Sequence, residues 1–196
     1  MSELRFFFDY VDPASYLLHS VLSEMEDAGT SVEVEPAPLE VRPPPLPVLA
    51  PTEEPWLSLH EEMGALAREL DVTLRTPGFI PWSRKAHELT LHAQEKGCFR
   101  PIHRALFEAH FVEGKDIGRV DVLVEIGSGH GLDRTEIKTV LDVDRFKDAV
   151  LEIQGQARQA EVVGVPTLLG PGRRLEGFQG PEAVHAFIDA IRSDAR

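Results

Sequence analysis

The N-terminal stretch from Leu4 to Tyr16, with the sequence LRFFFDYVDPASY, constrains the fold more than any other part of the chain. Its first half, Leu4 to Phe8, is aromatic and branched enough to predict a buried strand. Its second half predicts the start of a helix, because Asp12 can accept the free N–H groups of the first turn and Pro13 has no N–H to leave unpaired. Such a junction directs N–H groups and the positive end of the helix dipole to one point at the sheet edge. An anion, a thiolate or a carbonyl oxygen could be held there.

Composition excludes several classes of protein. The 196 residues suffice for one substantial core, or for a small domain that carries an insertion. Acidic residues outnumber basic ones, 33 to 20, for a net charge of −13, so there is no basic face that could follow a nucleic-acid backbone. No apolar run approaches the roughly 18 residues of a membrane span. The chain opens on a strand pattern rather than on an export signal, so we predict a cytoplasmic protein without a nucleic-acid or membrane partner. The oligomeric state is not predicted.

The thiol and imidazole groups do not form a recognisable metal motif. Cys98 is the single cysteine, which excludes an internal disulfide and an all-cysteine zinc site. Free cysteines usually pack as small hydrophobic residues. His87, His92, His103 and His110 lie on predicted helices, but their spacing matches no metal-binding pattern. We therefore predict no metal, and the chain has no glycine-rich nucleotide loop.

The first fifty residues predict a β-α-β unit followed by a connector. A helix is expected from Pro13 to Ala28, ended by Gly29. The alternation of apolar and acidic residues over Ser31–Glu35 predicts the second strand. The proline-dense segment Pro36–Pro55 is expected to be an extended connector, because each proline removes a donor and excludes a regular helix or a central strand.

Helical periodicity dominates from about Trp56 to about Leu141. Further helices are predicted by apolar spacing over a segment that begins near Trp56 and over Trp82–Lys96, Pro101–Val112, Val120–Ile126, Thr135–Leu141, Val143–Glu161 and Pro181–Ile191. Thr167–Leu169 and Arg174–Glu176 read as a hairpin of two short strands. We therefore predict an interrupted α/β fold, in which residues 1–50 and 143–196 form the α/β domain and residues 51–142 form an all-helical insertion.

Motifs spread along the chain carry a family resemblance. They are Asp9-Tyr-Val-Asp-Pro-Ala-Ser-Tyr16, Gly78-Phe-Ile-Pro81, Ala86-His87, Leu106-Phe-Glu-Ala-His-Phe111, Gly131-Leu-Asp133, Gly164-Val-Pro-Thr167 and Gly177-Phe-Gln-Gly-Pro181. In this order and spacing they resemble the thioredoxin-fold family that includes DsbA, the FrnE-like proteins, the 2-hydroxychromene-2-carboxylate isomerases and the kappa-class glutathione transferases. The resemblance covers nearly the whole chain. It implies a thioredoxin-like fold with an oxidoreductase-like or isomerase-like function.

The helix start differs from both kinds of family member. Redox members open this helix with Cys-Pro-x-Cys and glutathione-dependent members open it with Ser-Pro-x-Ser, whereas this chain has Asp12-Pro13-Ala14-Ser15. Thiol–disulfide exchange needs a nucleophilic thiolate and a second sulfur that resolves the mixed disulfide. Cys98 cannot supply both, so dithiol oxidoreductase activity is not expected.

Glutathione is disfavoured as a cofactor. The negative charge of Asp12 would occupy the N–H donors that a thiolate needs and would repel a second anion nearby. The resemblance also implies an Asp-Arg pair after the late glycine, which grips the tripeptide. Here Gly180 is followed instead by Pro181, Glu182 and Ala183. We predict no cofactor.

The Val165-Pro166 corner does not depend on cysteine. The resemblance implies that this peptide bond is cis and that it faces the helix start. A cis bond there would present the backbone N–H and C=O of Val165 outward. An extended peptide or the glutathione backbone could pair with these groups as an added strand.

The candidate site combines the helix start with this corner. Asp12 is proposed as a general acid or base, with Ser15 beside it, and the alternatives are a plain helix N-cap and a hydroxyl bonded to its own helix. The predicted substrate-binding residues are Pro13, Arg84, Val165 and Pro166. Arg84 could reach from the insertion over the cleft to hold a carboxylate, and its alternative is a solvated helix residue.

Two functions follow from this site. The first is a family protein that binds a small organic or peptide-like ligand without dithiol chemistry. The second is a non-catalytic binding module that kept the platform and lost the enzyme. The identity of the substrate and the presence of catalysis stay open at this point.

Overall fold

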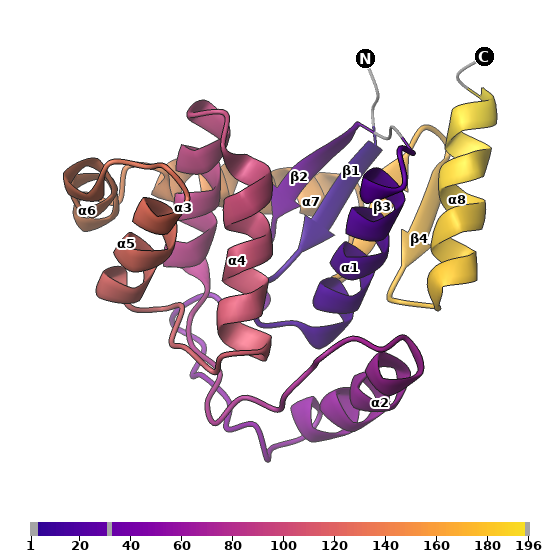
Figure 1. The fold of residues 1–196 in the computed structure, drawn as a ribbon, viewed down its shortest axis with the longest axis horizontal. Helices are drawn as coiled ribbons and strands as arrows, with labels where there is room; N and C mark the ends of the chain where they lie inside the picture. Colours follow the sequence, from indigo (N-terminus) through magenta and orange to yellow (C-terminus); the bar gives the residue numbers. More distant parts are fainter. Residues whose placement is uncertain (1–3, 31–32, 195–196) are drawn as a thin grey trace.

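A computed structural model describes residues 4–30 and 33–194, which form a four-stranded sheet with helices on both faces (Figure 1). The sheet order is β2-β1-β3-β4, with β1 and β2 parallel and the other neighbours antiparallel. The elements that belong to the sheet and its covering helices are β1 (Leu4–Phe8), α1 (Pro13–Asp27), β2 (Val34–Pro38), α7 (Lys147–Gln159), β3 (Thr167–Gly170), β4 (Arg173–Glu176) and α8 (Pro181–Asp194). This is the interrupted α/β arrangement that the sequence predicts.

The aromatic run of β1 is buried on both faces of the sheet. Successive side chains of a strand point to opposite faces. Phe6 and Phe8 therefore join the main core, whereas Phe7 packs with Ala157 and Val162 in a second, smaller core. A continuous apolar run is typical of a central strand that is covered on both sides.

The second strand begins later than predicted. The expected strand Ser31–Glu35 is observed at Val34–Pro38, and residues 31 and 32 lie outside the described residues. β2 thus includes Pro36 and Pro38 from the segment expected to be a connector. Prolines are tolerated because β2 is an edge strand, with β1 as its only neighbour in the sheet.

The insertion is helical, as predicted. Its helices are α2 (Trp56–Glu69), α3 (Arg84–Glu95), α4 (Phe99–Phe111), α5 (Val120–Gly129) and α6 (Arg134–Asp142). In Figure 1, α3 to α6 are grouped on one side of α1 and α8 lies on the other. The helix expected from Val143 begins instead at Lys147. Asp144 has a left-handed φ of 53°, which breaks the helical conformation between α6 and α7.

One main core joins the sheet to the insertion. Phe8 of β1, Leu17 of α1, Leu89 of α3, Phe107 of α4 and Val184 of α8 all belong to the same buried cluster. The start of α1 is therefore enclosed between the sheet and the insertion. In the described ranges, no helix has the length and apolar character needed to cross a membrane.

Candidate functional site

Asp12 caps α1 and binds Ser15 through two hydrogen bonds. The backbone N–H and the hydroxyl of Ser15 both donate to Oδ2 of Asp12, each at 2.6 Å. The extended backbone of Asp12 and the proline at the first helical position complete a regular N-terminus. Asp12 is only 3% exposed and Ser15 is fully buried. Any contribution of Ser15 to a site is therefore made through the position of Asp12.

Burial changes the acidity of Asp12. Desolvation raises the pKa of this carboxyl from its ordinary 3.8 to about 7, against the hydrogen bonds from Ser15 that lower it, and the nearby Asp9 raises it further. A carboxyl with this pKa is both a proton donor and a proton acceptor near neutral pH. Such groups are frequent in functional sites.

Asp9 acts electrostatically on both Asp12 and Glu40, and we refer to Asp9, Asp12 and Glu40 as the acidic cluster. Asp9 is fully buried, and its Oδ2 accepts a hydrogen bond of 2.7 Å from the backbone N–H of Val41. Nε2 of the buried His87 lies 3.2 Å from Oδ1 of Asp9. Burial raises the pKa of Glu40, whereas the electrostatic effect of His87 lowers it.

The sequence did not predict that Asp9 and Glu40 belong to this cluster. Asp9 follows directly on β1, at the end of the strand where sites often form, and Glu40 is an isolated acid in a proline-rich segment. The position of Asp9 could have identified it. Nothing local marks Glu40, because its partner is the backbone N–H of Arg84 in the insertion, at 3.3 Å.

The Val165–Pro166 corner lies at the same end of the sheet as the start of α1. Its peptide bond is cis, the isomer that the resemblance implies. Thr167 pairs with Phe7, so Pro166 comes opposite Phe8, the last residue of β1 before the acidic cluster. Pro166 accepts a hydrogen bond from Gly177 at 2.8 Å. Within the described residues, the backbone N–H and C=O of Val165 have no hydrogen-bond partner.

Arg84 does not direct its guanidinium to Asp12. Nε lies 3.5 Å from the buried Glu88, and Nη2 lies 3.4 Å from Asp144 in the turn before α7. The structure thus brings Asp12, Pro13 and Ser15 to the same end of the sheet as Val165 and Pro166. The guanidinium of Arg84 is bound to carboxylates of the chain itself, and its predicted role toward a ligand stays a prediction.

Exposed apolar side chains lie next to the acidic cluster. Val41, Val48 and Trp82 are each more than two-fifths exposed, and the indole N–H of Trp82 donates to the carbonyl of Leu46 at 3.3 Å. A small cavity of about 10 Å³ is bordered by Asp9, Val48 and Trp82. The surface beside the cluster therefore offers apolar contacts, and Arg42 also borders the small cavity.

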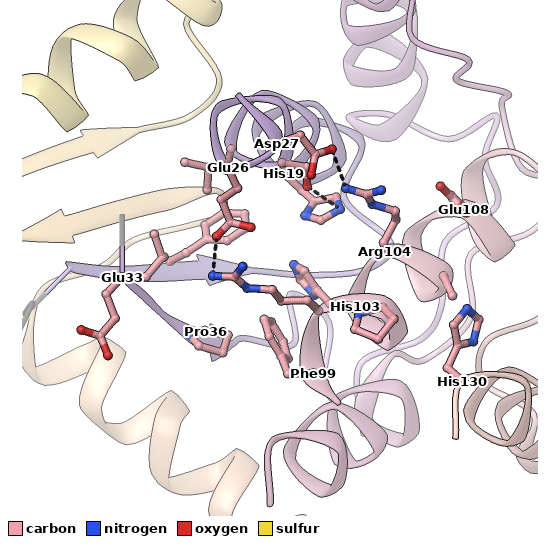
Figure 2. Close-up of a pocket in the computed structure, with 17 residues that line it drawn as sticks. His19, Glu26, Asp27, Glu33, Pro36, Phe99, His103, Arg104, Glu108 and His130 are labelled. Atoms are coloured by element: carbon pink, nitrogen blue, oxygen red, sulfur yellow. Dashed lines mark hydrogen bonds and ion pairs between the residues drawn. The ribbon is translucent and has the colours of Figure 1, made fainter. Parts of the chain in front are cut away.

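A much larger cavity lies elsewhere. It has a volume of about 450 Å³ and lies between α1, the start of β2 and α4 (Figure 2). No motif in the sequence indicated this cavity. Among residues 4–30 and 33–194, no group of three or more His, Cys, Asp or Glu side chains is placed to ligate a metal ion.

Comparisons with known proteins concern the chain as a whole. A family model described as DSBA-like thioredoxin domain matches residues 3–191. A curated relative, the uncharacterized protein YwbO of Bacillus subtilis, is 28% identical over an alignment of 193 residues, and the match covers 94% of each chain.

Solved structures show the same fold. A probable DsbA oxidoreductase from Streptomyces coelicolor superposes with a TM-score of 0.82 at 22% identity, over 97% of this chain and 89% of that one. A 2-hydroxychromene-2-carboxylate isomerase gives 0.79 at 18% identity, over 98% and 96%. The cytosolic disulfide reductase DsbM from Pseudomonas aeruginosa with GSH gives 0.69 at 19%, over 95% and 97%. The thioredoxin-like fold with helical content that the resemblance implies is thereby confirmed.

Proposed function

Because the chain belongs to the DSBA-like thioredoxin domain family, we propose that it binds a small organic or peptide-like ligand where the start of α1 meets the Val165–Pro166 corner. One observation carries this proposal. At the position where the resembled redox members have their first cysteine, the chain has a nearly buried carboxyl whose pKa is raised to about 7. The protein is thus an oxidoreductase-like or isomerase-like member that works without a dithiol.

The single thiol supports the exclusion of dithiol chemistry. Cys98 lies just before α4, and its Sγ is 3.7 Å from the carbonyl oxygen of Ala93. Burial raises the pKa of this thiol, whereas a reactive cysteine needs a lowered one. With one cysteine in the chain, no second sulfur is present to resolve a mixed disulfide.

The free backbone groups of Val165 support an extended ligand. Both groups lie just before Thr167, the first residue of β3, where an extended ligand would pair with them. The side chains of Val41, Val48 and Trp82 offer apolar contacts beside the cluster. A peptide-like or aromatic ligand with one polar group matches both features.

Asp12 is the residue assigned to the polar group of the ligand. In its neutral form the carboxyl donates a hydrogen bond, and in its ionised form it accepts one or removes a proton. Ser15 is a positioning residue, since its hydroxyl hydrogen is given to Asp12. The negative charge of the nearby Asp9 raises the pKa of Asp12 further, so Asp12 stays protonated up to a higher pH.

Reduced glutathione is expected to bind weakly or not at all. Its thiolate would meet the acidic cluster at the place where a positive potential is required. The relative from Pseudomonas aeruginosa whose structure contains GSH shares 19% identity with this chain, so the comparison shows the fold alone. An uncharged thioether or aromatic ligand does not meet this repulsion.

A thermal-shift screen tests the proposal. Reduced glutathione, S-alkyl glutathiones, aromatic acids and short apolar peptides are tested on wild type, Asp12→Asn and Asp133→Asn. Asp133 is the matched control, because it caps α6 on the insertion in the same way. A ligand at a hundred times its Kd stabilises by about 2.7 kcal/mol. We expect a stabilising compound whose effect is lost in Asp12→Asn and kept in Asp133→Asn.

Two results would contradict the proposal. One is micromolar affinity for reduced glutathione, which would mean that the electrostatics of the helix start favour a thiolate. The other is a compound that stabilises wild type and Asp12→Asn equally, because the binding site would then not include Asp12.

A non-catalytic binding module is the second candidate. Ser15 is fully buried and the cavity that borders Asp9 has only about 10 Å³, which favours surface binding over enclosed chemistry. The two candidates differ in turnover. A pH–rate profile with an inflection near 7 supports the enzyme, and tight binding with no change of the ligand supports the module.

A further inference from the structure

We propose that the large cavity between α1, β2 and α4 is a second binding site, which takes a small organic cation: an amine carried on an aromatic or aliphatic body. The cavity is lined on the side of α1 and the sheet by Phe6, Leu22, Val34 and Pro36, and on the side of α4 by Phe99 and Pro101. These apolar walls fit the body of such a ligand. The cavity borders the second half of α1, so this site is separate from the one at the helix start.

A buried imidazole forms part of the cavity wall. His103 is 95% buried, with 5% of its surface exposed, and its ring lies between His19 and Phe99 (Figure 2). The ring centres of His19 and Phe99 are 4.5 and 4.7 Å from that of His103. Nδ1 of His103 is 2.8 Å from the hydroxyl of Tyr10, on the inner side. Since the two ring nitrogens point to different sides, Nε2 is directed toward the cavity that His103 lines.

Hydrogen bonding determines which nitrogen of His103 carries the proton. The hydroxyl of Thr90 donates to the carbonyl of Ala86 at 3.0 Å, and the hydroxyl of Tyr10 lies 2.6 Å from the same Thr90 oxygen. Each hydroxyl has one hydrogen. All three contacts are hydrogen bonds only if Tyr10 donates to Thr90 and Nδ1–H of His103 donates to Tyr10.

Nε2 of His103 is therefore a lone-pair acceptor. Burial lowers the pKa of His103 well below its ordinary value, which keeps the ring neutral. An acceptor at the base of a cavity requires a donor from the ligand, and an ammonium N–H meets this requirement. A carboxylate ligand would place a lone pair against a lone pair.

The charged side chains of the cavity also favour a positively charged ligand. Its ionised residues are Arg100 and Arg104 against Glu26, Asp27, Glu33 and Glu108. Arg100 pairs with Glu26 at 3.2 Å, and Arg104 pairs with Asp27 at 3.3 Å. Glu33 and Glu108 have no ion pair within the described residues, so two carboxylates are available to a cation.

A neighbouring cavity adds to the negative electrostatic potential. It has a volume of about 440 Å³, shares Asp27, Arg104 and Glu108 with the first, and adds Glu24 and Glu113. The chain as a whole carries a charge of −13. An excess of charges of one sign along a cleft raises the local concentration of the opposite ion. The half-buried ring of Phe99 offers a face that also attracts a cation.

Three compounds of nearly the same shape test the proposal on the full chain. They are 3-phenylpropylamine, 3-phenylpropanoate and 3-phenylpropanol, titrated at pH 7.5 with detection by two-dimensional amide NMR. We expect saturable binding of the amine, with shifts on α1 and α4, and at least tenfold weaker binding of the acid and the alcohol. Equal affinity for the amine and the alcohol would overturn the proposal, as would preference for the acid or the absence of saturable binding by the amine.

Matched variants locate the binding. Ala105→Trp fills the cavity from α4 without removing a buried polar group, and it is expected to abolish binding of the amine. Glu108→Gln should weaken binding by roughly twofold to fivefold, the size of an exposed ion pair. Glu62→Gln changes the same charge on α2, away from the cavity, and should leave the affinity unchanged. Unaltered binding by Ala105→Trp, or equal effects of the two glutamate variants, would contradict the site.

Discussion

Asp12→Asn should stabilise the folded protein at neutral pH, although it alters the residue to which we assign the ligand. Burial raises the pKa of this carboxyl from 3.8 to about 7, so the folded state disfavours the ionised form. The carboxyl's favourable contribution is therefore complete below pH 3.8 and is lost as the pH rises through about 7. The pKa rises by about 3, and each pH unit of this rise corresponds to about 1.4 kcal/mol. Ionised Asp12 therefore reduces the free energy of unfolding by about 4 kcal/mol relative to the neutral carboxyl.

Asparagine avoids this loss and keeps the cap. Its side-chain oxygen can accept both hydrogen bonds of Ser15, and asparagine is as good an N-cap as aspartate. By linkage, the variant should exceed wild type in free energy of unfolding by about 2 kcal/mol at pH 5 and by about 4 kcal/mol at pH 8. Urea unfolding of both proteins from pH 5 to pH 8 measures this difference.

The difference in free energy of unfolding between wild type and Asp12→Asn reports the effect of Asp12 alone. Burial lowers the pKa of His19 to about 3 and that of His110 to about 4, so both proteins lose stability together as the pH falls below 6.5. Asp133→Asn is the control, because Asp133 is an exposed N-cap that accepts from Glu136 at 2.8 Å. It should change stability by less than about 0.5 kcal/mol at each pH. If Asp12→Asn is less stable than wild type at pH 8, the helix start stabilises the anion more than burial penalises it, and our assignment of the proton is wrong.

Three further predictions concern the scaffold. The double change Asp12→Cys, Ser15→Cys should form a disulfide and reduce insulin in the presence of dithiothreitol, because these two side chains already meet at 2.6 Å, whereas wild type should be inactive. A folded double variant without the disulfide would refute this geometry. Gly127→Ala should destabilise by about 1 to 3 kcal/mol, since a Cβ there would come within 2.7 Å of Ile137, as thermal unfolding can measure. Gly155→Ala, whose Cβ would meet nothing within 4 Å, should stabilise α7 by up to about 1 kcal/mol, and a loss of stability there would contradict the packing.

Local features of the chain could be predicted from the sequence because they depend on neighbouring residues. The N-cap at Asp12, the proline that follows it and the aromatic strand Leu4–Phe8 are each decided within one helical turn or one strand. Helical periodicity likewise located the helices of the insertion. The family motifs predicted the Val165–Pro166 corner near the helix start, and the two lie at the same end of the sheet.

Boundaries were less predictable where pairing overrides local pattern. β2 is displaced toward Pro38, because its register is set by parallel pairing with β1 rather than by the alternation of its own residues. α7 begins after Asp144, whose left-handed backbone no periodicity reveals.

The chemistry of the two sites was decided only by the tertiary structure. Asp9 and Glu40 come together with His87 because strand, connector and insertion converge, and this burial is what raises the pKa of Asp12. The cavity beside His103 arises in the same way, from the distance that packing leaves between α1 and α4. A capping hydrogen bond is an interaction between near neighbours, whereas desolvation and charge fields sum over whatever the fold brings within reach. The candidate residues at the helix start could therefore be identified from the sequence, but the protonation states on which the proposed functions depend are set by segments far apart in the chain.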